Sequence, residues 1–172
     1  MVQMLKNVTI VLLLITTSSL FAPTHKVLKL DGKTWAQTTF DSLSVDERIA
    51  QLFMIEVRPT YGVKHLDEVE RTIREHQVGG VIFFKGDPAQ QVRLTNRFQE
   101  MSKTKMLVAI DGEWGLAMRL SNTISYPYQL GLGGIQNETV IYDMGKEIGR
   151  QCKRMGIHIN FAPDIDVNNN PN

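Results

Sequence analysis

Apolar and polar residues follow one another along the chain in blocks that predict strands and helices in turn. Short apolar runs bounded by turn residues indicate buried strands. Between these runs, apolar residues recur three or four positions apart among charged residues, which is typical of helices with one buried face. Residues 121–134, rich in Ser, Tyr, Pro and Gly, are expected to form a long loop. The predicted strands cover residues 53–57, 81–84, 106–110 and 157–161.

Capping residues set the expected limits of the helices. Ser44 and Glu47 form a capping box, in which each side chain accepts a hydrogen bond from a free amide of the first turn. Pro88 suits the first turn of a later helix, and Asn137 and Gly156 bound the last one. The expected helices lie at residues 45–52, around 66–78, from 88 to about 101 and from 137 to about 155. Because strands and helices alternate, we predict an α/β fold with a parallel sheet and right-handed crossovers.

The N-terminus has the pattern of a secretory signal peptide. Lys6 precedes an apolar run at residues 8–15, and small and polar residues lead from there to Ala22. We therefore expect a signal peptide over residues 1–22, export to the periplasm or beyond, and no stable membrane span after cleavage. An uncleaved membrane-tethering helix is the alternative, although the run is shorter than the ~20 residues that a span needs. Residues 23–40 are expected to form an irregular arm.

Composition narrows the class of ligand. The 172 residues are 42% hydrophobic, and Lys and Arg (19) nearly balance Asp and Glu (18), so the formal charge is +1. A chain without a strong net charge has no overall field that would attract nucleic acid or anionic lipid. The single cysteine, Cys152, cannot form an intramolecular disulfide. It shares a helical stripe with Ile148, and we expect it to be a packing residue.

The most informative polar residues follow the third predicted strand. Asp111 comes directly after the apolar run 106–110, and Arg119 lies eight residues further on. In parallel α/β folds the carboxyl ends of the strands open onto the ligand crevice. An ionised carboxylate can accept hydrogen bonds from two hydroxyl groups, and a guanidinium offers a rigid fork of donors. Asp111 and Arg119 are therefore our candidates for binding a polar substrate.

Other polar residues have less specific interpretations. His158 is expected to be an inward-facing barrel residue with a satisfied hydrogen bond rather than a catalyst. Asp164 and Asp166 could be metal ligands or paired acids, but their spacing favours hydrogen bonds that fix a loop. Trp114 could stack on a ring of the ligand or pack the loop. Glu113 could support the nearby arginine or be a solvated carboxylate. No metal or cofactor is expected, because no His, Cys and Asp cluster has metal-ligand spacing.

Three segments resemble motifs of one enzyme family. The sequence DGEWG at residues 111–115, followed by Arg119, resembles the D-x-E-x-G-x-x-x-R loop of glycoside hydrolase family 3. VGGVIFF at residues 78–84 and NFAPDIDV at 160–167 resemble two further motifs of the same N-terminal barrel, in the same order. The resemblance implies that residues 41–172 form the first half, about four β/α units, of a TIM (β/α)₈ barrel. A complete barrel takes ~250 residues, so we expect a truncated chain with further domains downstream.

Within the family, the sequence is most similar to β-N-acetylhexosaminidases, and in particular to exported members of the Bacteroidetes type. The resemblance implies a carbohydrate substrate and retaining hydrolysis of terminal β-linked N-acetylhexosamine. Asp111 and Arg119 correspond to substrate-binding residues, whereas Leu116 departs from an arginine found in many relatives.

The nucleophilic Asp and the acid/base His are expected downstream of Asn172, so the chain alone is expected to be inactive and marginally folded. The alternatives are a β-glucosidase-like hydrolase and a non-catalytic glycan-binding fragment.

Overall fold

The computed structural model describes residues 34–164. The predicted signal peptide, the first part of the expected arm and Asp166 lie outside these residues. The last part of the arm is not irregular, because Trp35–Ser42 forms helix α2. The chain divides into two compact units, residues 1–38 and 39–172, and the features below belong to the second. In the described part of the chain, the helices are too short or too polar to span a membrane.

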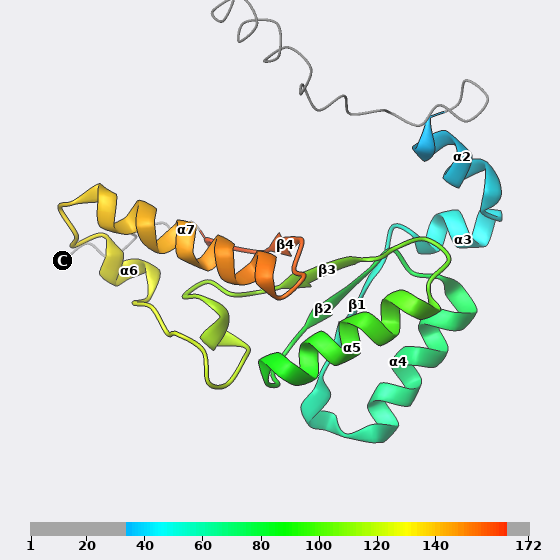
Figure 1. The fold of residues 1–172 in the computed structure, drawn as a ribbon, viewed down its shortest axis with the longest axis horizontal. Helices are drawn as coiled ribbons and strands as arrows, with labels where there is room; N and C mark the ends of the chain where they lie inside the picture. The colour runs from blue at the N-terminus through cyan, green and yellow to red at the C-terminus, as the bar shows by residue number, and fades with distance from the viewer. Residues whose placement is uncertain (1–33, 165–172) are drawn as a thin grey trace, which may run out of the picture. The chain divides into compact units, whose positions relative to one another are not determined.

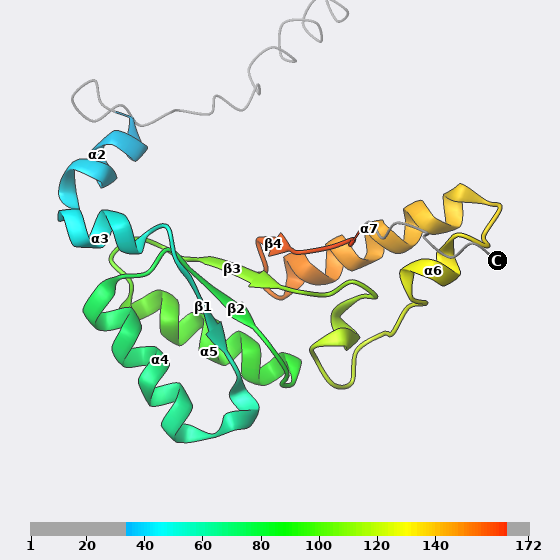
Figure 2. The same ribbon diagram turned by 180° about the vertical axis from the view of Figure 1, so that it is seen from behind.

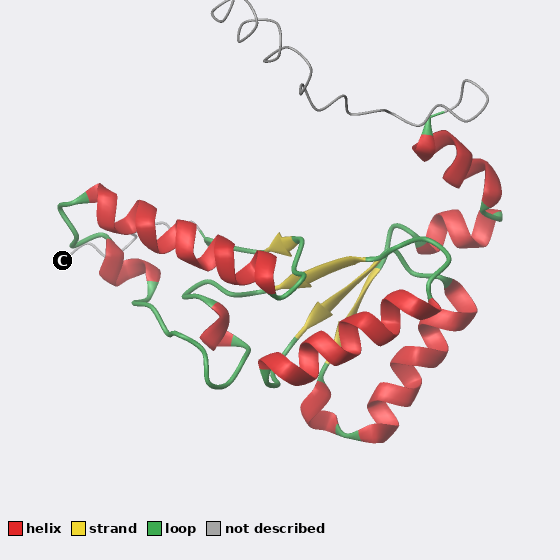
Figure 3. Cartoon of the chain, in the orientation of Figure 1, coloured by secondary structure: helices red, strands yellow, loops and turns green. Residues whose placement is uncertain are grey.

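Four strands form one parallel sheet, in the order in which they occur along the chain (Figure 1). The strands are β1 (Met54–Val57), β2 (Gly80–Phe83), β3 (Leu107–Ile110) and β4 (Ile159–Asn160). A helix joins each strand to the next, as Figure 3 shows, and the connecting helices are α4 (Val63–His76), α5 (Pro88–Met101) and α7 (Glu138–Arg154). The predicted order of strands and helices is confirmed, although β4 is shorter than the predicted strand at 157–161.

Most helices begin where the capping residues predict. The capping box of Ser44 and Glu47 is present and opens α3 (Val45–Ala50). The carboxylate of Asp87 accepts a hydrogen bond from the amide of Gln90 at 3.0 Å and opens α5. The expected loop at 121–134 contains one short helix, α6 (Gln129–Leu132). Two 3₁₀ turns, η1 (Pro59–Tyr61) and η2 (Leu116–Met118), follow β1 and β3.

Helices α4 and α5 cover one face of the sheet (Figures 1 and 2). Val57, Phe83 and Ile110 are neighbours in register, and all three side chains are fully buried against this helical layer. The rings of Phe83 and Phe98 stack with their centroids 6.4 Å apart. Cys152 of α7 is buried in the same core, and burial raises the pKa of its thiol. Its predicted role in packing is therefore confirmed.

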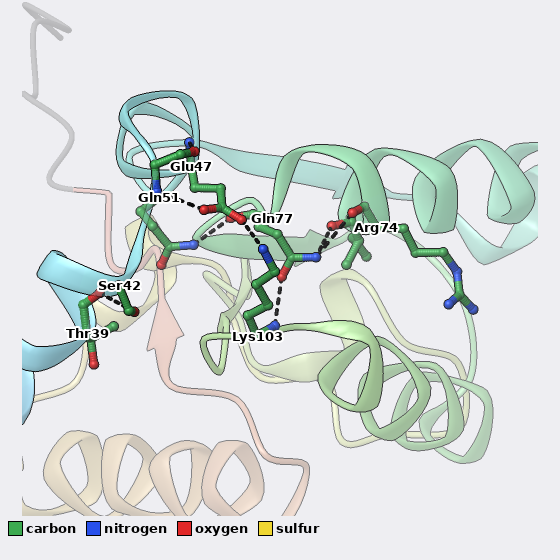
Figure 4. Close-up of polar contacts among 9 residues, drawn as sticks. Thr39, Ser42, Glu47, Gln51, Arg74, Gln77 and Lys103 are labelled. Carbon is green, nitrogen blue, oxygen red and sulfur yellow. Dashed lines mark hydrogen bonds and ion pairs between the residues drawn. The ribbon is translucent and has the colours of Figure 1, made fainter.

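A polar network ties the elements together at the amino-terminal end of the strands (Figure 4). Gln77 ends α4 in the left-handed conformation, and its side chain accepts a hydrogen bond from the amide of Lys103 at 2.7 Å. The side chain of Gln51 donates to the carbonyl of Gln77. The ammonium of Lys103 pairs with Glu47, and this contact lowers the pKa of the Glu47 carboxyl. Helix α3, the end of α4 and the segment before β3 are thus joined.

The first glycine of the VGG segment lies against the backbone of α3. The amide of Gly79 donates to the carbonyl of Ala50 at 3.1 Å. A Cβ atom at Gly79 would stand 2.0 Å from the carbonyl oxygen of Gln51, a separation at which backbone has to move. Gly79 is therefore required by close approach of two backbone segments, which fixes where β2 begins.

Replacement of Gly79 by alanine should destabilise the fold. Because the added methyl group meets backbone rather than a flexible side chain, we expect Gly79→Ala to lower the free energy of unfolding by ~1–3 kcal/mol. Gly145→Ala is the matched control, since Gly145 lies within α7 and an added Cβ atom there would meet no other atom within 4 Å outside its own stretch of helix. Because glycine within a helix is less stable than alanine, Gly145→Ala should raise the free energy of unfolding by ~0.5–1 kcal/mol. Urea unfolding measures both, and equal midpoints for Gly79→Ala and wild type would contradict the packing argument.

Candidate functional site

The two predicted site residues form an ion pair at the carboxyl end of β3. Asp111 is the first residue after the strand, and the turn η2 brings Arg119 back beside it. The guanidinium of Arg119 pairs with the carboxylate of Asp111, and its Nε donates to the Asp111 carbonyl at 2.9 Å. The side chain of Arg119 remains 16% exposed and that of Asp111 26% exposed. The pair is thus held in a fixed geometry with part of each group open to a ligand.

A glycine shapes the loop between these residues. Gly115 has φ +87°, a backbone conformation that other residues rarely adopt. A Cβ atom at Gly115 would lie 2.7 Å from the ring of Tyr126. The amide of Tyr126 also donates to the carbonyl of Trp114 at 3.0 Å. The second glycine of the DGEWG motif therefore has a structural role, because it lets the chain turn tightly against Tyr126.

Trp114 packs within its own loop. Its ring meets the ring of Tyr128 edge to face, with the centroids 4.6 Å apart and the planes at 81°. The side chain of Gln129 donates to the carbonyl of Glu113 at 2.7 Å, which holds the same loop against α6. The packing role considered for Trp114 is therefore present, and stacking on a sugar stays a hypothesis. The role of the Glu113 carboxylate also stays a prediction.

Side chains of β4 and of the residue before it fix the backbone of β3 and of the loop that follows it. The Nδ1 atom of His158 accepts a hydrogen bond from the amide of Val108 at 3.0 Å, so its expected hydrogen bond is confirmed. The Oδ1 atom of Asn160 accepts from the amide of Gly112 at 2.9 Å, and its Nδ2 donates to the carbonyl of Gly112 at 3.3 Å. Gly112, the residue next to Asp111, is therefore held through both its amide and its carbonyl group.

The expected inward orientation of His158 is wrong. Asn160 is the register partner of Ile110, whose side chain is fully buried against the helices. His158 lies two residues before Asn160 and lines the same groove as Gly149 and Cys152 of α7. Alternation along a strand puts residues two apart on one face. His158 and Asn160 are thus on the helix-facing side of the sheet, and Ile159 between them occupies the opposite face.

The structure adds two residues that sequence analysis missed, Arg58 and Phe84. They follow β1 and β2 as Asp111 follows β3. The guanidinium carbon atoms of Arg58 and Arg119 lie 4.9 and 4.6 Å from the centroid of the Phe84 ring. Arg58 also pairs with Glu56, whose carboxyl pKa is lowered by the hydrogen bonds from Arg58. The polar residues on either side of buried Val57 were the signal that could have identified Arg58.

Within residues 34–164, no three His, Cys, Asp or Glu side chains are grouped so that they could hold a metal ion. Asp164 is exposed at the end of the described chain. The preferred loop-fixing role of Asp164 and Asp166, and its metal and paired-acid alternatives, therefore stay predictions.

Comparison with known proteins gives a consistent result. The model of the glycosyl hydrolase family 3 N-terminal domain matches residues 44–172. The chain is 31% identical over 118 residues to β-hexosaminidase A of Pseudoalteromonas piscicida. The matched segment covers 61% of this chain and 20% of that protein. It is 26% identical over 135 residues to β-hexosaminidase LpqI of Mycobacterium tuberculosis, covering 75% of this chain and 33% of LpqI. The structure of the β-glucoside phosphorylase BglX bound to 2FGlc superposes with a TM-score of 0.67 at 21% identity, covering 75% of this chain and 23% of that one.

A parallel sheet with helical crossovers and a charged pair at its carboxyl edge is typical of α/β proteins, a class that includes the β/α barrels. The family match makes the assignment specific: the chain belongs to glycosyl hydrolase family 3, through its N-terminal domain. The predicted fold, the first half of a TIM barrel, is thereby confirmed. The chain spans a fifth to a third of the length of these curated relatives.

Loss of the Asn160 side chain should loosen the peptide that follows Asp111. We expect Asn160→Ala to speed hydrogen exchange of the Gly112 amide, because that amide loses its hydrogen-bond acceptor. Asn160→Asp is the matched control, since it keeps an oxygen at the accepting position and should protect the amide far better. NMR exchange rates measure the effect. Equal exchange in wild type and Asn160→Ala would show that this contact does not hold the site.

Proposed function

We propose that the protein carrying this chain hydrolyses terminal β-linked N-acetylhexosamine, chiefly N-acetylglucosamine, and that Asp111 and Arg119 hold the sugar. The observation that carries the proposal is their ion pair at the carboxyl end of β3 within a family 3 N-terminal domain. Relatives named as β-hexosaminidases support the choice of sugar. In barrel enzymes, this end of the strands is where substrates bind.

The pair suits a polyhydroxyl ligand. A sugar hydroxyl both donates and accepts hydrogen bonds, so one hydroxyl can bridge the carboxylate of Asp111 and the guanidinium of Arg119. Hydrogen bonds to charged groups are shorter and stronger than those between neutral groups. Because the Nε atom of Arg119 also donates to the backbone carbonyl of Asp111, the guanidinium is already held in place, and little side-chain freedom is lost when the ligand binds.

Bond cleavage is assigned to other residues. The proposed mechanism is retaining: an aspartate attacks the anomeric carbon, and water then hydrolyses the glycosyl-enzyme. We place the aspartate nucleophile and the histidine acid/base after Asn172, in agreement with the family resemblance. Asp111 and Arg119 would contribute by fixing the sugar ring relative to those groups, since misplacement of the reacting atoms costs rate.

Export is part of the proposal. The apolar run at residues 8–15, with Lys6 before it and Ala22 after the polar segment, has the length and flanks of a signal peptide. An exported hydrolase would meet cell-wall or chitin-derived glycans outside the cytoplasm. Sequencing the N-terminus of the secreted or periplasmic protein tests this proposal, and a mature protein that still begins at Met1 would contradict it.

A panel of aryl glycosides tests the activity. The protein encoded by the complete reading frame should release 4-nitrophenol from the N-acetyl-β-D-glucosaminide faster than from the β-D-glucoside. The opposite preference would favour the β-glucosidase-like alternative. Binding of N-acetylglucosamine without turnover of any glycoside would favour a non-catalytic glycan-binding protein.

Asp111→Asn should weaken turnover in the same assay. The change removes charge-assisted hydrogen bonds worth ~1.5–3 kcal/mol each, which corresponds to about a ten- to hundredfold loss of kcat/KM. Asp67→Asn makes the same chemical change at an exposed position on α4 and should leave kcat/KM unchanged. Unchanged kinetics in Asp111→Asn would remove this residue from the site.

A further inference from the structure

A second carboxylate–guanidinium pair lies at the carboxyl edge of the sheet. Glu56 is the third residue of β1 and Arg58 follows the strand. The NH2 group of Arg58 donates to Oε2 of Glu56 at 2.9 Å, and its Nε bonds the other carboxylate oxygen. This pair has the same chemistry as the pair of Asp111 and Arg119, and it comes from the strand on the other side of β2.

Sheet register puts these residues on one face. Val57, Phe83 and Ile110 are aligned, and their fully buried side chains point into the helical layer. The next residue of each chain segment therefore points toward the opposite face, which is the inside of the barrel. The amide of Phe84 donates to the carbonyl of Val57 at 2.8 Å, so the ladder continues regularly at this level. The resulting row consists of Arg58, Phe84 and Asp111.

Phe84 brings the two pairs together. The guanidinium groups of Arg58 and Arg119 both lie within 5 Å of the centroid of its ring. The two guanidinium carbon atoms therefore cannot lie farther apart than the sum of their distances to the Phe84 centroid. This span is comparable to that of one hexose with its hydroxyl groups. The amide of Arg58 donates to Nε2 of His65 at 2.9 Å, which fixes the backbone that presents the guanidinium.

We propose that Glu56 and Arg58 bind the same sugar unit as Asp111 and Arg119, and that they select an uncharged sugar. This inference rests on the proposed function. The four groups comprise two carboxylates and two guanidinium groups, so their formal charges cancel. They supply donors and acceptors on both sides of Phe84, which matches a ring of hydroxyl groups better than a phosphate or a carboxylate.

A comparison within the chain argues against a merely structural role. Arg97 bonds both carboxylate oxygens of Glu70, and that carboxylate is only 10% exposed because it lies between α4 and α5. The side chains of Glu56 and Arg58 are 45% and 28% exposed. The ion pair of Arg97 and Glu70 joins two packed helices, whereas Glu56 and Arg58 both lie at the end of β1, so their pairing joins no second element of the described chain.

The experiment compares Arg58→Ala with a matched pair elsewhere. Arg150 makes a similar two-point contact with Glu147 on the outer surface of α7, so Arg150→Ala removes an equivalent ion pair away from the site. In the protein from the complete reading frame, KM for 4-nitrophenyl N-acetyl-β-D-glucosaminide and Kd for N-acetylglucosamine are measured. Arg58→Ala should raise both by about tenfold or more, the factor expected for a lost hydrogen bond to a charged group. Arg58→Lys keeps the positive charge but cannot make the two-point contact of a guanidinium, so it should recover part of the lost affinity. Arg150→Ala should change neither KM nor Kd.

The outcomes separate this inference from the proposed function. Normal turnover by wild type with unchanged KM and Kd in Arg58→Ala would overturn the role of Arg58 and leave the hydrolase proposal intact. If wild type neither cleaves the glycosides nor binds N-acetylglucosamine, both proposals fail. If Arg58→Ala does not fold, as judged by circular dichroism, the double variant Glu56→Gln, Arg58→Gln removes both charges together. The same rise in KM and Kd is then required, and its absence overturns the inference.

Discussion

The alternation of side chains across the parallel sheet is the constraint on which the rest of the structure depends. Helices α4 and α5 cover one face, so Val57, Phe83 and Ile110 have to point into that layer. A strand offers its residues to its two faces in turn. The first residue after each strand therefore has to leave the core, and the chain places charged or aromatic residues at these points. Burial on one side thus places the candidate binding residues on the other.

The two ends of the sheet differ in the kind of contact that they make. At the amino-terminal end, contacts are made largely by backbone groups and amide side chains, as in the close approach of Gly79 to Gln51 and the bonds of Gln77. These contacts leave little room for variation. At the carboxyl end, charged pairs with partial exposure lie on short turns. This division agrees with barrel enzymes, in which one end serves stability and the other end carries the site.

The sequence predicted those features that depend on neighbouring residues. Capping at Ser44, the helix start at Pro88 and the acid after the third apolar run are local patterns, and the structure has all three. The cluster around Phe84 was missed because it depends on the register between strands, which no local pattern gives. Helix α6 was missed because four residues are too few for a helical period. The side of the sheet on which His158 lies was mispredicted, since alternation by itself does not say which face the helices cover.

The side chains of His158 and Asn160 have a consequence for how the fourth strand is aligned. Only Ile159–Asn160 form the strand, yet the side chain of His158 bonds the β3 backbone at Val108, and the side chain of Asn160 bonds the backbone of Gly112 just after β3. A slip of β4 by one residue in either direction would bring isoleucine or phenylalanine side chains to those peptide groups, and these side chains can neither donate nor accept a hydrogen bond. The sequence H-x-N therefore encodes one alignment and penalises its neighbours, so a strand of two residues can be positioned as accurately as a long one.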